Sequence, residues 1–160
     1  MRDKRSKVER KLEQRLRFEP EEIVKLIAAC ADDAALGAMI RLAAFTGARR
    51  EGLASLRVES VVKVQGIDCF KLAEKTGAGV RTVPIHPAIQ PLVKQLIEIS
   101  TDGFLIPSEA DKYGHRGDRL GKQFTKLKSS LGFGENHTFH SIRHTVVHLF
   151  RSAACPTEIR

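Results

Sequence analysis

The stretch that most constrains how this chain can fold is residues 34–45, AALGAMIRLAAF, which is apolar at nearly every position. As a helix it would present apolar side chains on all sides, and a helix of that kind is buried in the middle of a domain. Asp32 or Asp33 is placed to cap its first turn, and Thr46-Gly47 breaks it. The sequence therefore predicts a fold organised around one central helix.

Short helices and a small sheet are predicted around this central helix. Pro20-Glu21-Glu22 opens a helix, with a proline and two acidic residues in its first turn. Strand-like segments flank a Gln65-Gly66 turn, and Pro84 places the last of them at a sheet edge. The predicted strands are residues 61–64, 67–73 and 81–85, and the further predicted helices are residues 49–56, 87–99, 119–131 and 139–153. The expected fold class is mainly α with a small antiparallel three-stranded sheet (α+β).

Charge is distributed unevenly along the chain. The 160 residues have a net charge of +8, and residues 1–17 alone hold eight Lys/Arg against three Asp/Glu. We interpret residues 1–18 as a basic arm or the remnant of an interdomain linker, and residues 19–160 as one domain, in which residues 156–159 begin a further helix. A basic arm favours a polyanionic partner, most often nucleic acid, although a solvated linker is equally compatible with the charge.

Composition also bears on the compartment. No apolar run approaches the roughly 20 residues that span a bilayer, and the basic start lacks the apolar segment of a secretory signal. Cys30, Cys69 and Cys155 are odd in number and far apart, which fits neither a disulfide framework nor a zinc motif. We therefore expect a cytoplasmic protein with reduced thiols and no membrane partner.

Two short motifs indicate chemistry on a phosphodiester. In His140-Ser141-Ile142-Arg143-His144, helical spacing puts both histidines and the arginine on one face. The guanidinium matches the geometry of phosphate oxygens, and an imidazole can transfer protons near neutral pH. A second arginine, Arg49, follows the Thr46-Gly47 break, where a side chain can point into a cleft.

Other readings of the same region are less favoured. His140, His144 and His148 recur every four residues, as in a metal-binding stripe. No carboxylate or cysteine completes a ligand set, and Arg143 would repel a cation, so we expect no metal. On the preceding helix, three lysines are equally compatible with a DNA-facing edge and with a solvated face: Lys122, Lys126 and Lys128.

The order of these motifs resembles the catalytic domain of the tyrosine recombinases (phage integrases), from about residue 19 to residue 160. The resemblance rests on Thr46-Gly47-Ala48-Arg49 after an apolar helix, a hairpin with Lys75 ahead of Arg81-Thr82-Val83-Pro84-Ile85, and the His140–His144 motif. Each piece alone is weak, but three in this order on the expected elements make a specific match.

The resemblance implies roles for individual residues. Arg49 and Arg143 would hold the non-bridging oxygens of the scissile phosphate and stabilise its transition state. Lys75 would protonate the departing 5′ oxygen, with Lys71 and Lys63 as competing candidates, and His140 would transfer a proton with the nucleophile. Arg81 would join Arg49, Lys75 and Arg143 in contacting DNA. The implied activity is site-specific recombination or integration of duplex DNA through a 3′-phosphotyrosyl intermediate, with self-assembly on DNA and without a cofactor.

The chain departs from the family pattern in its tyrosines. In the family a further histidine or tryptophan, and then the nucleophilic tyrosine, follow the His-x-x-Arg-His helix. The one tyrosine here, Tyr113, precedes that helix. We therefore expect a catalytic domain, residues 19–160, that is incomplete at its C-terminus, and a 160-residue chain that is inactive alone. Two alternatives stay open: a non-catalytic DNA-binding remnant or regulatory relative, and a DNA-relaxing enzyme like the type IB topoisomerases.

Overall fold

A computed structural model describes residues 16–73 and 80–155. Residues 1–15 of the predicted basic arm, Lys75 and the predicted turn at residues 156–159 lie outside the described residues.

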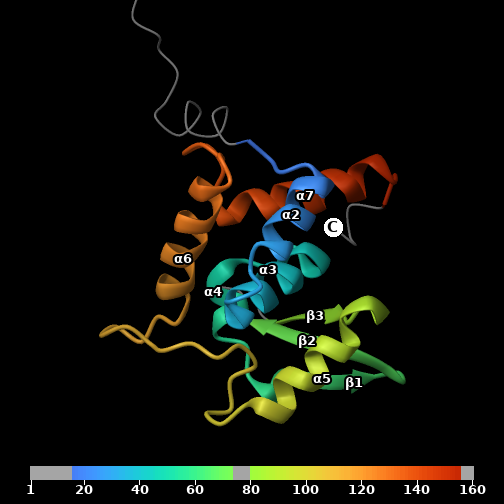
Figure 1. Ribbon diagram of the computed structural model, residues 1–160. Helices are drawn as coiled ribbons and strands as arrows, with labels where there is room; N and C mark the ends of the chain where they lie inside the picture. Colours follow the sequence, from blue (N-terminus) through green and yellow to red (C-terminus); the bar gives the residue numbers. More distant parts are fainter. Residues whose placement is uncertain (1–15, 74–79, 156–160) are drawn as a thin grey trace, which may run out of the picture.

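Helix α3 (Ala34–Thr46) is the centre of the fold (Figure 1), and seven of its residues are buried. It packs against α2 (Pro20–Ala28), α4 (Arg50–Ala54), α6 (Gly117–Ser130) and α7 (Phe139–Ser152). Asp33 caps it by accepting a 3.0 Å hydrogen bond from the backbone N–H of Leu36, and Gly47 ends it in the left-handed region, at φ 60°. The predicted central helix is confirmed.

A three-stranded antiparallel sheet follows α4, in the order β1 (Val61–Val64), β2 (Ile67–Ala73), β3 (Val80–Pro84). The turn between β1 and β2 uses the residues that the sequence indicated, since Gln65 and Gly66 both have positive φ, 50° and 82°. Pro84 lies on edge strand β3, opposite Cys69. The expected fold class is confirmed, and the third strand begins one residue earlier than predicted.

The sheet and α5 (Gln90–Ile99) form one layer, and α2 and α7 lie on the other side of α3 (Figure 1). The helix predicted at residues 87–99 is divided into a 3₁₀ turn, η2 (Pro87–Ile89), and α5. A second 3₁₀ turn, η1 (Val58–Ser60), leads from α4 into β1. One hydrophobic core runs through both layers and includes Phe70 of β2 and Leu53 of α4, each fully buried.

Phe18 joins the chain before α2 to α6, to the loop after α6 and to α7. Phe18 is fully buried, and its ring centroid lies 6.2 Å from that of Phe124 and 5.1 Å from that of Phe133. The hydroxyl of buried Thr145 donates to the Phe18 carbonyl at 2.5 Å, which fixes this segment against α7. Phe18, which lies within the predicted basic arm at residues 1–18, therefore packs into the core of the domain.

Lys128 corrects one of the sequence-based readings. Only 5% of this residue is exposed, and its ammonium group donates to the Gly134 carbonyl at 2.6 Å. Lys122 and Lys126 are exposed. A solvated or DNA-facing edge of α6 therefore includes these two lysines and not Lys128.

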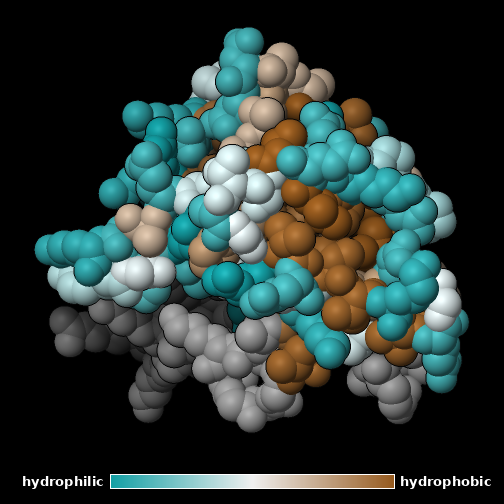
Figure 2. All heavy atoms as spheres, turned by 90° about the horizontal axis from the view of Figure 1, so that it is seen from below, coloured by the Kyte–Doolittle hydropathy of each residue, from teal (hydrophilic) through white to brown (hydrophobic). Residues whose placement is uncertain are grey.

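Hydrophobic side chains gather on the face that the sheet and α5 present (Figure 2). Ile67 and Val64 of the hairpin and Ile99 of α5 are 55%, 40% and 52% exposed. Among the described helices, none has the length and apolar character needed to span a bilayer.

Candidate phosphate-binding site

Helix α7 sorts its side chains between the core and a groove. Phe139, Ile142 and Val146 are buried against the other helices. His140 and His144 lie on another face, with ring centroids 4.9 Å apart in an edge-to-face arrangement. The N-cap residue of the helix is Thr138, whose backbone N–H donates to the Ser141 hydroxyl at 3.0 Å. The spacing of the His140–His144 motif therefore produces the single face that the sequence predicted.

Arg143 connects this helix to the other motif. Its Nη1 donates a 2.5 Å hydrogen bond to the carbonyl of Gly47, which is 96 residues away in the sequence. Gly47 itself packs closely on α7, because a Cβ added there would lie 3.1 Å from Cγ1 of Val146. The structure therefore brings the Thr46-Gly47 break and the His140–His144 motif into direct contact.

Arg49 lies two residues beyond this contact. It is the N-cap of α4, with φ −73° and ψ 150°, and its carbonyl accepts from the N–H of Leu53 at 3.1 Å. Its side chain is exposed. The backbone of Arg49 is thus held between the Gly47–Arg143 hydrogen bond on one side and α4 on the other.

A groove of about 650 Å³ runs along α7 beside the chain segment that leads into α2. Most of its lining side chains are cationic or can become so, and Glu19, paired with Arg17 at 3.2 Å, is the one acidic residue among them. The lining residues are Leu16, Arg17, Glu19, His140, Arg143, His144, Val147, His148 and Arg151. Such a groove is suited to an anion with several oxygens, such as a phosphate of a nucleic-acid backbone.

The remaining predicted site residues are placed differently. Neither Arg49 nor Arg81 is among the described residues that line this groove. Arg81 is half-buried on β3, opposite Leu72 of β2. Lys75, on the segment between β2 and β3, is outside the described residues. The structure thus brings the segment before Arg49 into contact with Arg143. The catalytic and DNA-binding roles of all the predicted site residues stay predictions: Arg49, Lys75, Arg81, His140 and Arg143.

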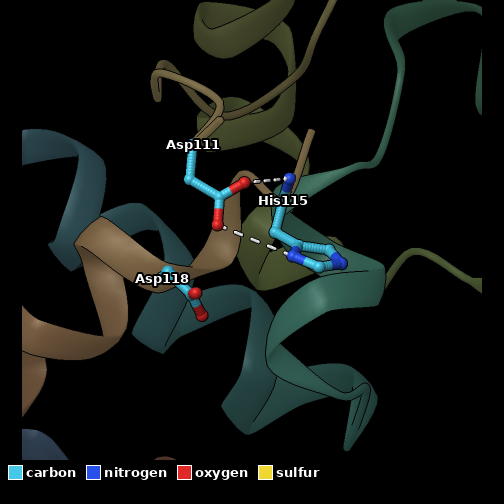
Figure 3. A group of neighbouring side chains, drawn as sticks. All are labelled: Asp111, His115 and Asp118. Atoms are coloured by element: carbon cyan, nitrogen blue, oxygen red, sulfur yellow. Dashed lines mark hydrogen bonds and ion pairs between the residues drawn. The ribbon is translucent and has the colours of Figure 1, made fainter. Parts of the chain in front are cut away.

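One cluster of metal-ligand type lies elsewhere, in the loop before α6 and the first turn of that helix. Ligand atoms of Asp111, His115 and Asp118 lie within 4.8 Å of one another (Figure 3). Asp111 accepts hydrogen bonds from the backbone N–H groups of His115 and Tyr113, both at 2.8 Å, and these bonds, that from His115 first, hold the pKa of its carboxyl below the usual range. Asp118 is paired with Arg50 at 2.8 Å. The two carboxylates therefore have structural partners already, so the cluster closes the loop and anchors α4.

Sequence reasoning missed this cluster and the partners of α4. The Asp111-x₃-His115-x₂-Asp118 spacing was visible in the sequence. The role of Glu51 was not, because its carboxylate accepts from the backbone N–H groups of Arg116 and Gly117, at 3.1 and 3.2 Å, which lie more than sixty residues away.

Comparison with known proteins defines the class. The family model described as "Phage integrase family" matches residues 16–158 of the chain. The protein belongs to this family. No curated protein is significantly similar to the chain in sequence.

Several solved structures share the fold. A lambda integrase, residues 75–356, bound to DNA is 17% identical with a TM-score of 0.72, over 92% of this chain and 55% of that one. XerA recombinase is 18% identical with a TM-score of 0.66, over 90% of this chain and 53% of that one. The Tn1549 transposon integrase in complex with circular intermediate DNA is 17% identical with a TM-score of 0.68, over 89% and 54%. The chain spans about half the length of these relatives.

Proposed function

We propose that this domain binds the backbone of duplex DNA and supports site-specific recombination by breaking and rejoining a phosphodiester bond. The observation that carries the proposal is the hydrogen bond from Arg143 to the Gly47 carbonyl, which brings the Arg49 segment against the helix that bears His140 and Arg143. Membership of the phage integrase family and the likeness to integrases and recombinases solved with DNA support it.

In the proposed mechanism, the arginines bind the phosphate and the histidine handles the proton. Arg143 and Arg49 donate to the non-bridging oxygens, whose charge increases as a fifth oxygen approaches phosphorus. His140 takes the proton of the attacking hydroxyl, and Lys75 supplies a proton to the 5′ oxygen that leaves. No step requires a metal ion. Arg81 contacts the DNA backbone beside the reacting phosphate.

The attacking group in cleavage is a tyrosine, and we propose that it is not Tyr113. This side chain is 71% exposed in the loop before α6, with its ring beside His115 and Lys112. Tyr113 is not among the described residues that line the groove with His140 and Arg143, and a nucleophile must lie beside the groups that bind the phosphate and take its proton. These 160 residues should accordingly form no covalent adduct with a nicked suicide substrate, and an adduct on a denaturing gel would show that Tyr113 is the nucleophile.

The rejoining half of the reaction tests the site without a tyrosine. The substrate is a library of nicked duplexes in which one end at the nick carries a 3′-p-nitrophenyl phosphate and the adjoining end carries a 5′-hydroxyl. In the joining step, the 5′ oxygen forms a bond to phosphorus and p-nitrophenolate leaves. The hydroxyl proton passes to His140 or Lys75. The expected inactivity of the chain alone concerns cleavage, which needs the tyrosine. Joining of these activated strands does not need it, so we expect the chain to join them and to release p-nitrophenolate.

Matched variants separate this function from the alternatives. Arg143→Ala should abolish joining and reduce DNA binding by about tenfold, the scale of a lost charge-assisted hydrogen bond. Lys94→Ala, which removes one exposed charge from α5, should do neither. DNA binding without any joining would favour the non-catalytic DNA-binding module. In a longer chain that supplies the tyrosine, relaxation of supercoils without exchange between matched sites would favour the topoisomerase-like alternative.

A further inference from the structure

Helix α4 is too short to hold its own orientation. It has five residues, Arg50–Ala54, and an isolated helix of that length is not stable in water. Its buried side chains Leu53 and Ala54 point into the core. Its two charged residues, Arg50 and Glu51, both reach α6 instead. The direction in which α4 begins is therefore set by α6.

Glu51 supplies the missing cap of α6. The N-cap residue of α6, Arg116, gives that helix no side-chain cap. The Glu51 carboxylate accepts from the N–H of Arg116 at 3.1 Å and from the N–H of Gly117 at 3.2 Å. A carboxylate at a helix N-terminus also interacts favourably with the helix dipole. This contact joins α4 to α6 by two hydrogen bonds from a single side chain.

Arg50 lies along α6 in a channel that two glycines leave open. Its Nη2 donates to Asp118 Oδ1 at 2.8 Å. A Cβ at Gly117 would overlap with Oε2 of Glu51, and a Cβ at Gly121 would overlap with Nη1 of Arg50 and lie 3.0 Å from its Cζ. Both glycines are buried, and neither has a positive φ. They are glycines here because any side chain would displace Arg50 or Glu51.

We propose that Arg50 and Glu51 are positioning residues for Arg49, so that the surface of α6, and not only that of α7, determines where the Arg49 guanidinium stands. The segment from Gly47 to Glu51 is held at one end by Arg143 and at the other by α6, and Arg49 lies between the two attachments. The inference rests on the proposed function in one respect, namely that Arg49 binds a DNA phosphate.

The test uses Glu51→Gln, with Glu59→Gln as the matched control. Glu59 is exposed on η1 and paired with Arg57, so its substitution removes the same charge without touching α6. Removing a negative charge from a chain of net charge +8 should tighten DNA binding if the effect is only electrostatic. If Glu51 positions Arg49, Glu51→Gln should instead weaken DNA binding, because Arg49 would no longer reach its phosphate.

The first measurement is the salt dependence of binding to a short fluorescent duplex. We expect the slope of log K against log[salt] to become shallower by about 0.9 in Glu51→Gln, the value for one lost phosphate contact. Arg49→Ala should show the same change, and the Glu51→Gln/Arg49→Ala double variant should show no more than either single variant. Binding by Glu51→Gln as tight as that by Glu59→Gln would overturn the inference.

The second measurement does not depend on DNA. In ¹⁵N NMR spectra of Glu51→Gln, the chemical shift of the Arg49 Nε–Hε signal should change, and its relaxation should show a more mobile side chain. In Glu59→Gln, both should stay unchanged. An unchanged Arg49 signal in Glu51→Gln would refute positioning, whatever happens to DNA binding. If the signal changes as expected while Arg49→Ala binds DNA like the wild type, positioning stands and the role of Arg49 in the proposed function fails.

A second pair of variants covers the case in which Glu51→Gln does not fold. Gly121→Ala forces Arg50 out of its channel and leaves the carboxylates of Glu51 and Asp118 in the chain. Gly134→Ala adds the same methyl group where no atom lies within 4 Å. Gly121→Ala should reproduce the shift of the Arg49 signal, and Gly134→Ala should not. Equal Arg49 signals in the two variants would contradict the inference.

Discussion

Gly47 is the position where one methyl group should cost the most. Its φ of 60° lies in the left-handed region, where a residue with a Cβ is strained by about 1–2 kcal/mol. An added Cβ would also lie 3.1 Å from Val146 Cγ1, closer than ordinary carbon contacts, and would touch Val146 Cβ at an ordinary 3.5 Å. Because Val146 is buried on α7, relief of this contact requires its side chain or the helix to shift by a few tenths of an ångström within a packed core.

The two contributions can be separated with a control. Overpacking in a core costs about 1–3 kcal/mol, so Gly47→Ala should lower the free energy of unfolding by about 2–5 kcal/mol in total. Gly132→Ala shares the positive φ, 87°, but its Cβ would meet nothing within 4 Å. It should cost about 1–2 kcal/mol, from backbone strain alone. The difference between the two variants measures the contact with α7.

Urea unfolding followed by circular dichroism gives both values, and a thermal melt provides a check. In a domain of this size, 1 kcal/mol corresponds to about 2–4 °C in Tm. Gly47→Ala should also weaken the Arg143–Gly47 hydrogen bond and, with it, DNA joining. Equal losses of stability in Gly47→Ala and Gly132→Ala would refute the close approach of this turn to α7.

Three further predictions concern stability and thiol chemistry. Asp33→Ala removes both the cap on Leu36 N–H and the 2.8 Å hydrogen bond from Gln123, and should cost about 1–2 kcal/mol in the same urea assay. The control is Asp32→Ala, which changes the neighbouring exposed aspartate. A loss of stability in Asp33→Ala no larger than that in Asp32→Ala would contradict this assignment. Burial, and then the charge of Asp33, raise the pKa of Cys30 to about 11, so at pH 8 the half-buried Cys155 should react with a disulfide reagent well before Cys30. Because the pKa of Cys30 is higher in the folded than in the unfolded chain, its contribution to stability is complete below pH 9 and is lost as pH rises toward 11. Cys30→Ala should flatten the fall in stability over that range. An unchanged profile of stability against pH would show that the thiol is not the cause.

The parts of the fold that sequence reasoning predicts well are those set by local rules. The central helix follows from apolar residues on all its sides, and the hairpin follows from a Gln65-Gly66 turn between alternating segments. Lys128 shows where the same rules were available but not applied. It falls four residues after Phe124 and eight after Leu120, so helical spacing places it on the buried face. Only its partner, the Gly134 carbonyl, needed the structure.

In the candidate site, too, local rules predict the residues that lie on one helix but not the contacts between distant segments. His140, Arg143 and His144 could be placed on one face because they lie on a single helix, where spacing alone determines direction. The contact with Gly47 followed from the order of motifs, since nothing in the local sequence requires segments 96 residues apart to meet.

Arg49 shows the limit of that reasoning. It precedes a five-residue helix whose direction depends on backbone N–H groups and glycines of α6, and such partners leave no mark in the sequence around Arg49. A motif can therefore identify which arginine takes part, while the residues that orient it are found only through the packing of a distant helix. For this reason Gly117 and Gly121, which no catalytic motif includes, are expected to be as sensitive to substitution as the residues beside Arg49 itself.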